Sequence, residues 1–291
     1  MFYLRDTRTG RLEPVAPAGH NQLRVSICSH AARPHLGDLR SHVLCDLIRR
    51  AAELGGLHVN VGQDVTRAGH LTDGPDLAAL NVQPAAHPSS ESQPASIDVH
   101  VDGPGQCVRH HHDERAPSHP AVGPDVVTSW VSSGQVLFEG EDPSASNAPS
   151  LSDLALRGLD SLALRLAFLE EHYRQQIELR WSDIETADKD LRRWREQVAR
   201  WANEPSAPMS RRHVRSVLSA FANDLATPTA VRELRDMEMD TSVAPGAKFE
   251  TFAYLDRLLG LDLVRDVGKS GGPEAPRQSD ELLNHDQGGT P

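Results

Sequence analysis

The sequence predicts an α/β fold, with a parallel sheet in the first half of the chain and an α-helical bundle in the second. Two observations lead to this class. A strand pattern, a helical stripe and a second strand pattern follow one another between residues 22 and 61, and after Glu139 the helical periodicity is almost unbroken. Hydrophobic residues make up 38% and charged residues 24% of the 291 residues, which is typical of a globular protein.

The first unit is a strand, a helix and a strand. Residues 23–27 alternate apolar and polar side chains up to Cys28, which predicts a strand. Residues 39–54 place their apolar side chains on one helical face, and Gly55-Gly56 ends that helix. Residues 57–61 form the next strand. Because such crossovers are right-handed, we expect the two strands to be parallel.

The middle of the chain is less regular. Residues 73–96 are rich in Pro, Ser and Ala and are predicted to form a loop or linker. A strand is predicted at 97–100 and a helix around 110–121. Residues 125–131 and 135–138 are then predicted to pair as two strands, with the turn between them.

The second half is predicted to be helical, and its short loops indicate antiparallel neighbours in a bundle. The six predicted helices are 151–157, 159–175, 181–202, 211–225, 229–237 and 248–259. Starts are marked by acceptor side chains or a proline at Ser150, Asp160, Ser182, Ser210 and Thr227-Pro228. The predicted domains are 1–148, containing the linker, and 149–267, and the tail 268–291 is predicted to be disordered because it has few apolar anchors.

Composition narrows the cellular setting. No apolar run approaches the roughly 20 residues that a membrane helix needs, and the first residues lack the pattern of a signal peptide. Three cysteines (Cys28, Cys45 and Cys107) are too few for a disulfide framework and predict a cytoplasmic location, with Cys45 as a small core residue.

The net charge of −11 means that a nucleic-acid partner would need a local basic face. The candidate is an arginine-rich stretch, interleaved with acidic residues, that contains Arg192, Arg193, Arg195, Arg200, Arg211, Arg212 and Arg215. A solvated helix face is the favoured interpretation, and a nucleic-acid footprint is the alternative.

Cys28 ends the first predicted strand, and His35-Leu36-Gly37-Asp38 follows it after a short loop. This segment resembles the opening of the cysteinyl-tRNA synthetase family of class I aminoacyl-tRNA synthetases, in which a HIGH-type motif follows a cysteine at the end of the first strand. Residues 97–100 resemble the family's IDIHGGG, and residues 109–116 resemble its PHHEDERA. Further matches follow in the family's order at 60–66, 69–73, 131–140, 151–154, 158–160, 245–252 and 258–263.

The resemblance implies a Rossmann-like fold with most of the connective insertion absent, and adenylation of cysteine by ATP before transfer to tRNA. It gives catalytic roles to His35, Gly37 and Asp38, at a helix N-terminus that favours anions. His35 would donate a hydrogen bond, and Gly37 would let the backbone approach the nucleotide. Asp38 would place a carboxylate beside the phosphates, which is repulsive.

The second family motif, KMSKS, corresponds in register to residues 142–146, Asp-Pro-Ser-Ala-Ser. Both lysines are missing, so Ser144 and Ser146 are the residues left to contact ATP. One lost donor of this kind costs about 10²–10³ in rate. We therefore expect adenylation to be weak or absent.

The resemblance also implies a zinc ion that binds the substrate thiolate, because zinc suits soft sulfur. Cys28, His110 and Glu114 match three of its ligands, and the last two are four residues apart on one helical face. The fourth ligand falls in the missing segment, and Cys107 is a candidate replacement. The alternative is a leftover cysteine and histidines on a solvated helix.

These features leave several functions open. The first is an ATP-dependent cysteine ligase whose acceptor is tRNA or, as in the mycothiol cysteine ligase that the chain also resembles, a small amine. The family's anticodon-binding domain has no counterpart in the sequence, which puts tRNA in doubt. The others are a non-catalytic paralogue acting as a binding or regulatory module, and a decayed duplicate with no selected function.

Overall fold

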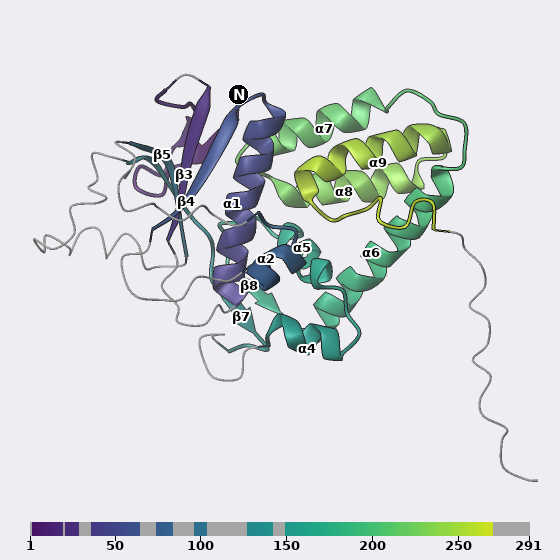
Figure 1. The fold of residues 1–291 in the computed structure, drawn as a ribbon, viewed down its shortest axis with the longest axis horizontal. Helices are drawn as coiled ribbons and strands as arrows, with labels where there is room; N and C mark the ends of the chain where they lie inside the picture. The colour runs from purple at the N-terminus through teal and green to yellow at the C-terminus, as the bar shows by residue number, and fades with distance from the viewer. Residues whose placement is uncertain are drawn as a thin grey trace, which may run out of the picture.

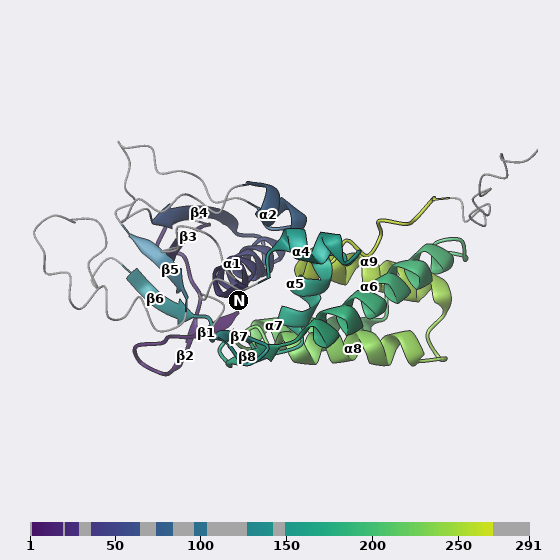
Figure 2. The ribbon, with the colours of Figure 1, turned by 90° about the horizontal axis from the view of Figure 1, so that it is seen from below.

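A computed structural model describes residues 2–19, 21–28, 36–64, 74–83, 96–103, 127–141 and 149–269. A parallel sheet lies on one side of the molecule and a group of helices on the other, with the long helix α1 (Leu36–Leu54) between them (Figures 1 and 2). The predicted α/β class is therefore confirmed.

The sheet contains the predicted strand–helix–strand unit. Strand β3 (Gln22–Cys28) pairs in parallel with β4 (His58–Asp64), and α1 connects them. On its other side β3 pairs in parallel with β5 (Ile97–Asp102), which pairs in parallel with β6 (Val127–Ser132). The order β4-β3-β5-β6 places the two central strands in the middle of the core.

Helix α1 packs on the sheet because its apolar residues recur at helical spacing. Val43, Leu44, Leu47 and Ile48 are all buried, as the periodicity predicts. Cys45 is 3% exposed and lies among them, which confirms that it is a core residue. The helix starts three residues earlier than predicted, at Leu36.

A short hairpin precedes the sheet and was not predicted. It consists of β1 (Tyr3–Arg5) and β2 (Leu12–Pro14), which are antiparallel. Asp6, between them, is 1% exposed and accepts hydrogen bonds from the backbone N–H groups of Arg8, Thr9 and Trp130. This carboxylate therefore fixes the hairpin turn and ties it to β6.

Three predictions in the middle of the chain were wrong. The segment 73–96 is not all loop, because Gly74–Ala79 forms helix α2. Strand β7 (Val136–Phe138) does not pair with β6 but runs parallel to β8 (Ile177–Leu179). Helix α5 (Ser161–Leu169) stops before 175, since the following turn leads into β8.

A close backbone approach explains the change of partner at β7. The N–H of Gly134 donates to the carbonyl of Tyr173 at 2.7 Å. A Cβ atom at Gly134 would lie 2.0 Å from the carbonyl oxygen of Gln175, so only glycine fits. The chain is thereby directed towards the turn before β8 instead of back along β6.

The other predicted helices are present, with shifted ends. They are α4 (Leu151–Leu156), α6 (Trp181–Trp201), α7 (Arg211–Ala222), α8 (Thr227–Met239) and α9 (Pro245–Leu259). Ser150 and Asp160 accept hydrogen bonds as N-caps, as predicted. Ser182 does not start α6, because Arg180 is the N-cap and Asp183 bonds to its N–H.

The sheet and the helical region share a continuous apolar core that also holds a buried ion pair. Asp46 of α1 and Arg165 of α5 are 2.7 Å apart, and both side chains are fully buried. Arg165 also donates to the carbonyls of Leu80 and Leu259, so it joins α1, α2 and α9. A domain boundary at 148/149 stays a prediction. No helix in the described ranges is long and apolar enough to cross a membrane.

Candidate functional site

The candidate site lies at the carboxyl end of the parallel sheet. The chain leaves β3 to one side through α1 and β4, and the later strands β5 and β6 lie on the other side. In open α/β sheets, ligands bind in the crevice at such a change of direction, beyond the carboxyl ends of the strands. Here that change of direction falls between β3, which ends at Cys28, and β5, which ends at Asp102, so the crevice is expected beyond these two strand ends.

The first turns of α1 close one side of this crevice. The hydroxyls of Ser41 and Ser133 are 2.8 Å apart and buried, and the N–H of Ser133 donates to the carbonyl of Asp102 at 3.0 Å. A Cβ atom at Gly103 would lie 3.8 Å from the Ser41 hydroxyl. Helix α1 and the ends of β5 and β6 are therefore held together by small polar groups.

Arg40, in the first turns of α1, bonds to the backbone that precedes β7 and β8. Its guanidinium donates to the carbonyls of Gly134 (2.9 Å), Gln175 (2.6 Å) and His172 (2.9 Å). Burial lowers the pKa of Arg40 to about 10, and Glu171 opposes that shift. The guanidinium of Arg40 therefore bonds to the β6–β7 connection and to the turn before β8.

Two buried histidines lie near the same end of the molecule. His100 in β5 is fully buried, and its ring is 4.8 Å from that of Trp130 in β6. Burial lowers the pKa of His42 in α1 to about 4, so this imidazole is neutral at pH 7. His42 cannot supply positive charge to a bound anion at that pH.

Few of the predicted site residues can be located. Cys28 ends β3, Gly37 lies at the start of α1, and Asp38 is half-buried in the first turn of α1. Topology thus brings these three to the carboxyl end of the sheet. The others lie outside the described residues, namely His35, His110, Glu114, Ser144 and Ser146.

The predicted zinc ligands cannot be tested as a set. Within the ranges that the structure covers, no group of three or more His, Cys, Asp or Glu side chains could hold a metal ion. His110 and Glu114 fall outside those ranges, as does Cys107. The donors Cys28, His110 and Glu114 have the chemistry that zinc accepts, but only their sequence supports the site.

The structure adds Arg40, Ser41, Asp102 and Ser133 to this region, none of which the sequence singled out for the site. For Asp102, the sequence did contain a signal that could have assigned it to the site. Strand β5 ends at Asp102, which Gly103 follows, and ligands bind beyond the carboxyl ends of such parallel strands. Arg40 offered no such signal, because its partners are carbonyls far along the chain.

The first arginines of the arginine-rich stretch are paired with carboxylates of the fold. Arg192 bonds to Asp188 at 2.6 Å, Arg193 bonds to Glu238 at 2.9 Å, and Arg195, which is nearly buried, bonds to Asp160 at 2.6 Å. These pairs support the interpretation as a helix face with compensated charge. The exposed side of α7 carries three further arginines of the stretch, Arg211, Arg212 and Arg215.

Comparisons with known proteins bear on this region. Residues 86–189 match the family model for the class I (C) tRNA synthetase catalytic domain. A cysteine--tRNA ligase from Rippkaea orientalis is 36% identical over 94 residues, which are 32% of this chain and 19% of that protein. The L-cysteine:1D-myo-inositol 2-amino-2-deoxy-alpha-D-glucopyranoside ligase of Acidothermus cellulolyticus is 34% identical over 109 residues, 37% of this chain and 27% of that protein.

A solved chain described as a candidate arginyl tRNA synthetase from Campylobacter jejuni overlaps 83% of this chain and 91% of its own, with a TM-score of 0.46 and 12% identity. This chain aligns with only 19% and 27% of the lengths of the two curated relatives.

The matched segment contains β5, β6, β7 and β8, and it does not contain β3 or β4. Through it, the chain is similar to the class I aminoacyl-tRNA synthetases. Within that class its similarity is to the cysteine--tRNA ligases and to the L-cysteine ligase of Acidothermus. The residues that the motif comparison assigned at Cys28 and His35 lie outside the matched segment.

Proposed function

We propose that the chain is a cysteine--tRNA ligase-like protein in which ATP-dependent activation of cysteine is weak or lost. One observation carries this proposal. The first lysine of the chain is Lys189, so the whole sheet region, including residues 142–146, contains none. Catalysis at phosphates depends on positive groups held against the developing charge, and the segment in register with the lysine motif offers Asp142 instead.

Within the described ranges, the arginines of α1 do not replace those lysines. Arg40 is committed to three carbonyls, and Arg49 and Arg50 are committed to Asp46 on another face of α1. Asp38 and Asp102 add carboxylates at the same end of the sheet. Bound ATP would supply the α-phosphate for activation, and these residues give its phosphates repulsion where attraction is needed.

The first experiment is cysteine-dependent ATP–pyrophosphate exchange by the full chain. We expect activity that is undetectable or several orders of magnitude below that of a complete synthetase, since each lost donor costs about 10²–10³. Asp142→Lys with Ala145→Lys should tighten ATP binding, and Asp38→Asn should tighten it further. Strong exchange by the unmodified chain, abolished by His35→Ala, would contradict the proposal.

A matched control separates local from general charge effects. Glu204→Lys with Ala207→Lys makes the same two changes in the loop between α6 and α7, in the helical region. Because exposed charges more than about 10 Å apart are largely screened at 0.1 M salt, this control should leave ATP binding unchanged. An equal gain from both pairs would show that Asp142 and Ala145 do not face the nucleotide.

A second candidate is a ligase that transfers cysteine to a small amine. It is favoured by the match to the Acidothermus ligase, which covers more of this chain than the Rippkaea tRNA ligase does, 37% against 32%. A pyrophosphate release assay with cysteine, ATP and an amino sugar would detect it. Release that requires the amino sugar and is unaffected by tRNA would select this function.

A further inference from the structure

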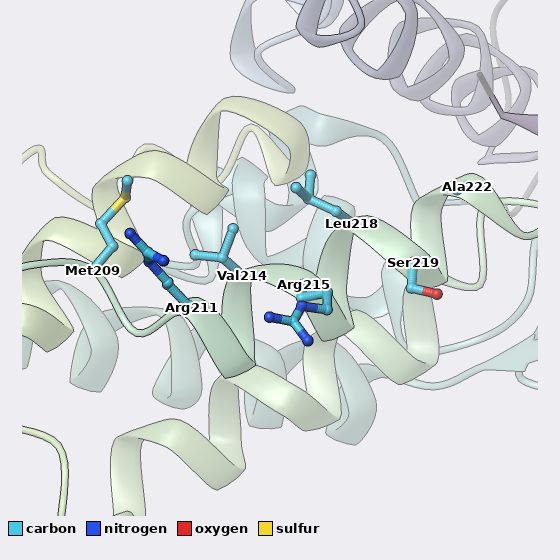
Figure 3. A pocket seen from close by; sticks show the side chains of 7 residues that line it. All are labelled: Met209, Arg211, Val214, Arg215, Leu218, Ser219 and Ala222. Carbon is cyan, nitrogen blue, oxygen red and sulfur yellow. The ribbon is translucent and has the colours of Figure 1, made fainter.

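A groove on the outer side of α7 has no role in the crevice chemistry. Its apolar wall is formed by Val214, Leu218 and Ala222, which recur every four residues and are all half-buried. Arg211 and Arg215 form a parallel row beside them, and both are exposed. Figure 3 shows Val214 and Leu218 pointing to the same side of the helix.

The groove continues into a hollow of about 480 Å³ at the junction of the sheet region and the helices, because Leu218 and Ala222 line both. Side chains from α1, α7 and α9 surround this hollow, including Leu54, Phe221 and Leu258. The hollow lies where α1 ends and β4 begins, at the amino end of the strands. It is therefore at the opposite end of the strands from the candidate site, which lies at their carboxyl ends.

The arginine row is not balanced within the described part of the chain. Arg211 and Arg215 have no salt bridge to a carboxylate there, in contrast to Arg192, Arg193 and Arg195 of α6. A ligand for the groove should combine leucine-sized apolar groups, which the apolar wall would bury, with acidic groups next to them, which would pair with the arginines.

We propose that the groove binds residues 279–286 of this same chain. This segment reads Ser-Asp-Glu-Leu-Leu-Asn-His-Asp, so Leu282 and Leu283 directly follow two acidic residues, Asp280 and Glu281. Residues 270–291 contain four acidic residues and a single arginine, which complements the arginine row. The two leucines cover the apolar wall, and the two carboxylates lie against Arg211 and Arg215.

The length of the chain permits this contact. Lys269 is 11 residues after Leu258, which lines the hollow, so the two are separated by at most about 40 Å. The 13 residues from Lys269 to Leu282 can span about 43–47 Å. Leu282 can therefore return to the hollow whatever direction the chain takes after Lys269.

Hydrogen–deuterium exchange of the full chain tests the proposal directly. Amides of residues 279–286 and of the exposed side of α7 should exchange at least about tenfold slower in the unmodified chain than in Leu282→Ser/Leu283→Ser, the effect of a closed population of about ten to one. Arg211→Glu/Arg215→Glu should remove the same protection. Asp280→Lys/Glu281→Lys in that background should restore it.

Arg11→Glu is the control, because Arg11 is an exposed arginine on the β1–β2 turn and does not line the groove or the hollow. It should leave the exchange unchanged. Protection that disappears on dilution, with dimers in sedimentation, would show that a second copy supplies the segment and would overturn binding within one chain. Exchange of 279–286 at the rate of an unstructured peptide in the unmodified chain would overturn the proposal altogether.

Discussion

Helix α1 makes two different kinds of contact. One is on the side that meets the helical region, and the other is in its first turns, next to the sheet. On the first, Asp46 and Arg165 form a fully buried ion pair supported by Arg49 and Arg50. On the second, contacts are made by the small hydroxyls of Ser41 and Ser133, and no lysine lies anywhere in the sheet region. The comparison teaches that the charges holding this fold are separate from the charges that phosphate chemistry needs. The fold can therefore persist without the chemistry.

The largest expected effect comes from the buried pair. Asp46→Leu leaves the fully buried guanidinium of Arg165 without its carboxylate. Removing one partner of a buried pair costs about 3–5 kcal/mol in the free energy of unfolding. Urea denaturation measures this loss. A loss below about 1 kcal/mol would mean that the carbonyls of Leu80 and Leu259 are enough to stabilise the buried guanidinium of Arg165 without Asp46. It would also contradict the proposed difference between the two sides of α1.

The second effect depends on pH and concerns the sheet side of α1. Burial lowers the pKa of His42 from 6.5 in the unfolded chain to about 4 in the folded protein. Between these values the unfolded chain binds the proton and the folded protein does not, so stability falls as the pH is lowered from 6.5 towards 4. The loss should reach about 3 kcal/mol, which His42→Leu should remove.

Urea midpoints at pH 4.5 and pH 7.5, for the unmodified chain and the His42→Leu variant, measure that difference. His58→Leu is a matched control at the start of β4, because it removes an exposed histidine. An equal reduction of the pH dependence by both variants would show that His42 is not buried in its neutral form.

The third effect tests the close approach that redirects the chain after β6. Gly134→Ala places a methyl group 2.0 Å from the carbonyl oxygen of Gln175, and backbone atoms must move. We expect a cost of about 1–3 kcal/mol in urea denaturation. Gly62→Ala in β4 meets nothing within 4 Å and should be neutral or slightly stabilising. Similar results for both would remove the explanation given for the pairing of β7.

The smallest effect separates exposed from buried arginines on α6. Arg192→Ala breaks a pair with Asp188 in which the arginine side chain is 55% exposed, and exposed pairs contribute about 0.2–1 kcal/mol. Arg195→Ala should cost more, since that side chain is 4% exposed and also donates to two carbonyls. Equal losses in thermal or urea unfolding would contradict the assignment of Arg195 to the core.

The sequence predicted those elements whose signal is local. The alternation in β3, the apolar stripe of α1 and the caps at Ser150 and Asp160 need only neighbouring residues, and all are found. It failed where a distant partner decides the conformation. Strand β7 pairs with β8, across α4 and α5, and nothing near residues 136–138 indicates this.

The same reasoning applies to the candidate site. Cys28, Gly37 and Asp38 could be assigned to the carboxyl end of the sheet, because the order of strand and helix fixes that position. Arg40 could not, since its role depends on carbonyls at Gly134, His172 and Gln175 that only the folded chain brings near it. The assignments of His35, His110, Glu114, Ser144 and Ser146 remain predictions from the motif resemblance.

The pairing of β7 with β8 has a consequence for how the chain can be divided. A cut between residues 141 and 149 would leave one strand of this small sheet on each fragment. Each fragment would then carry an unsatisfied strand edge. Arg40 would be separated from the carbonyls of Gln175 and His172, and Arg165 from that of Leu80. Each fragment would supply the strand that the other lacks. The two fragments should therefore purify together as a folded complex when they are co-expressed, and neither should fold when it is expressed alone.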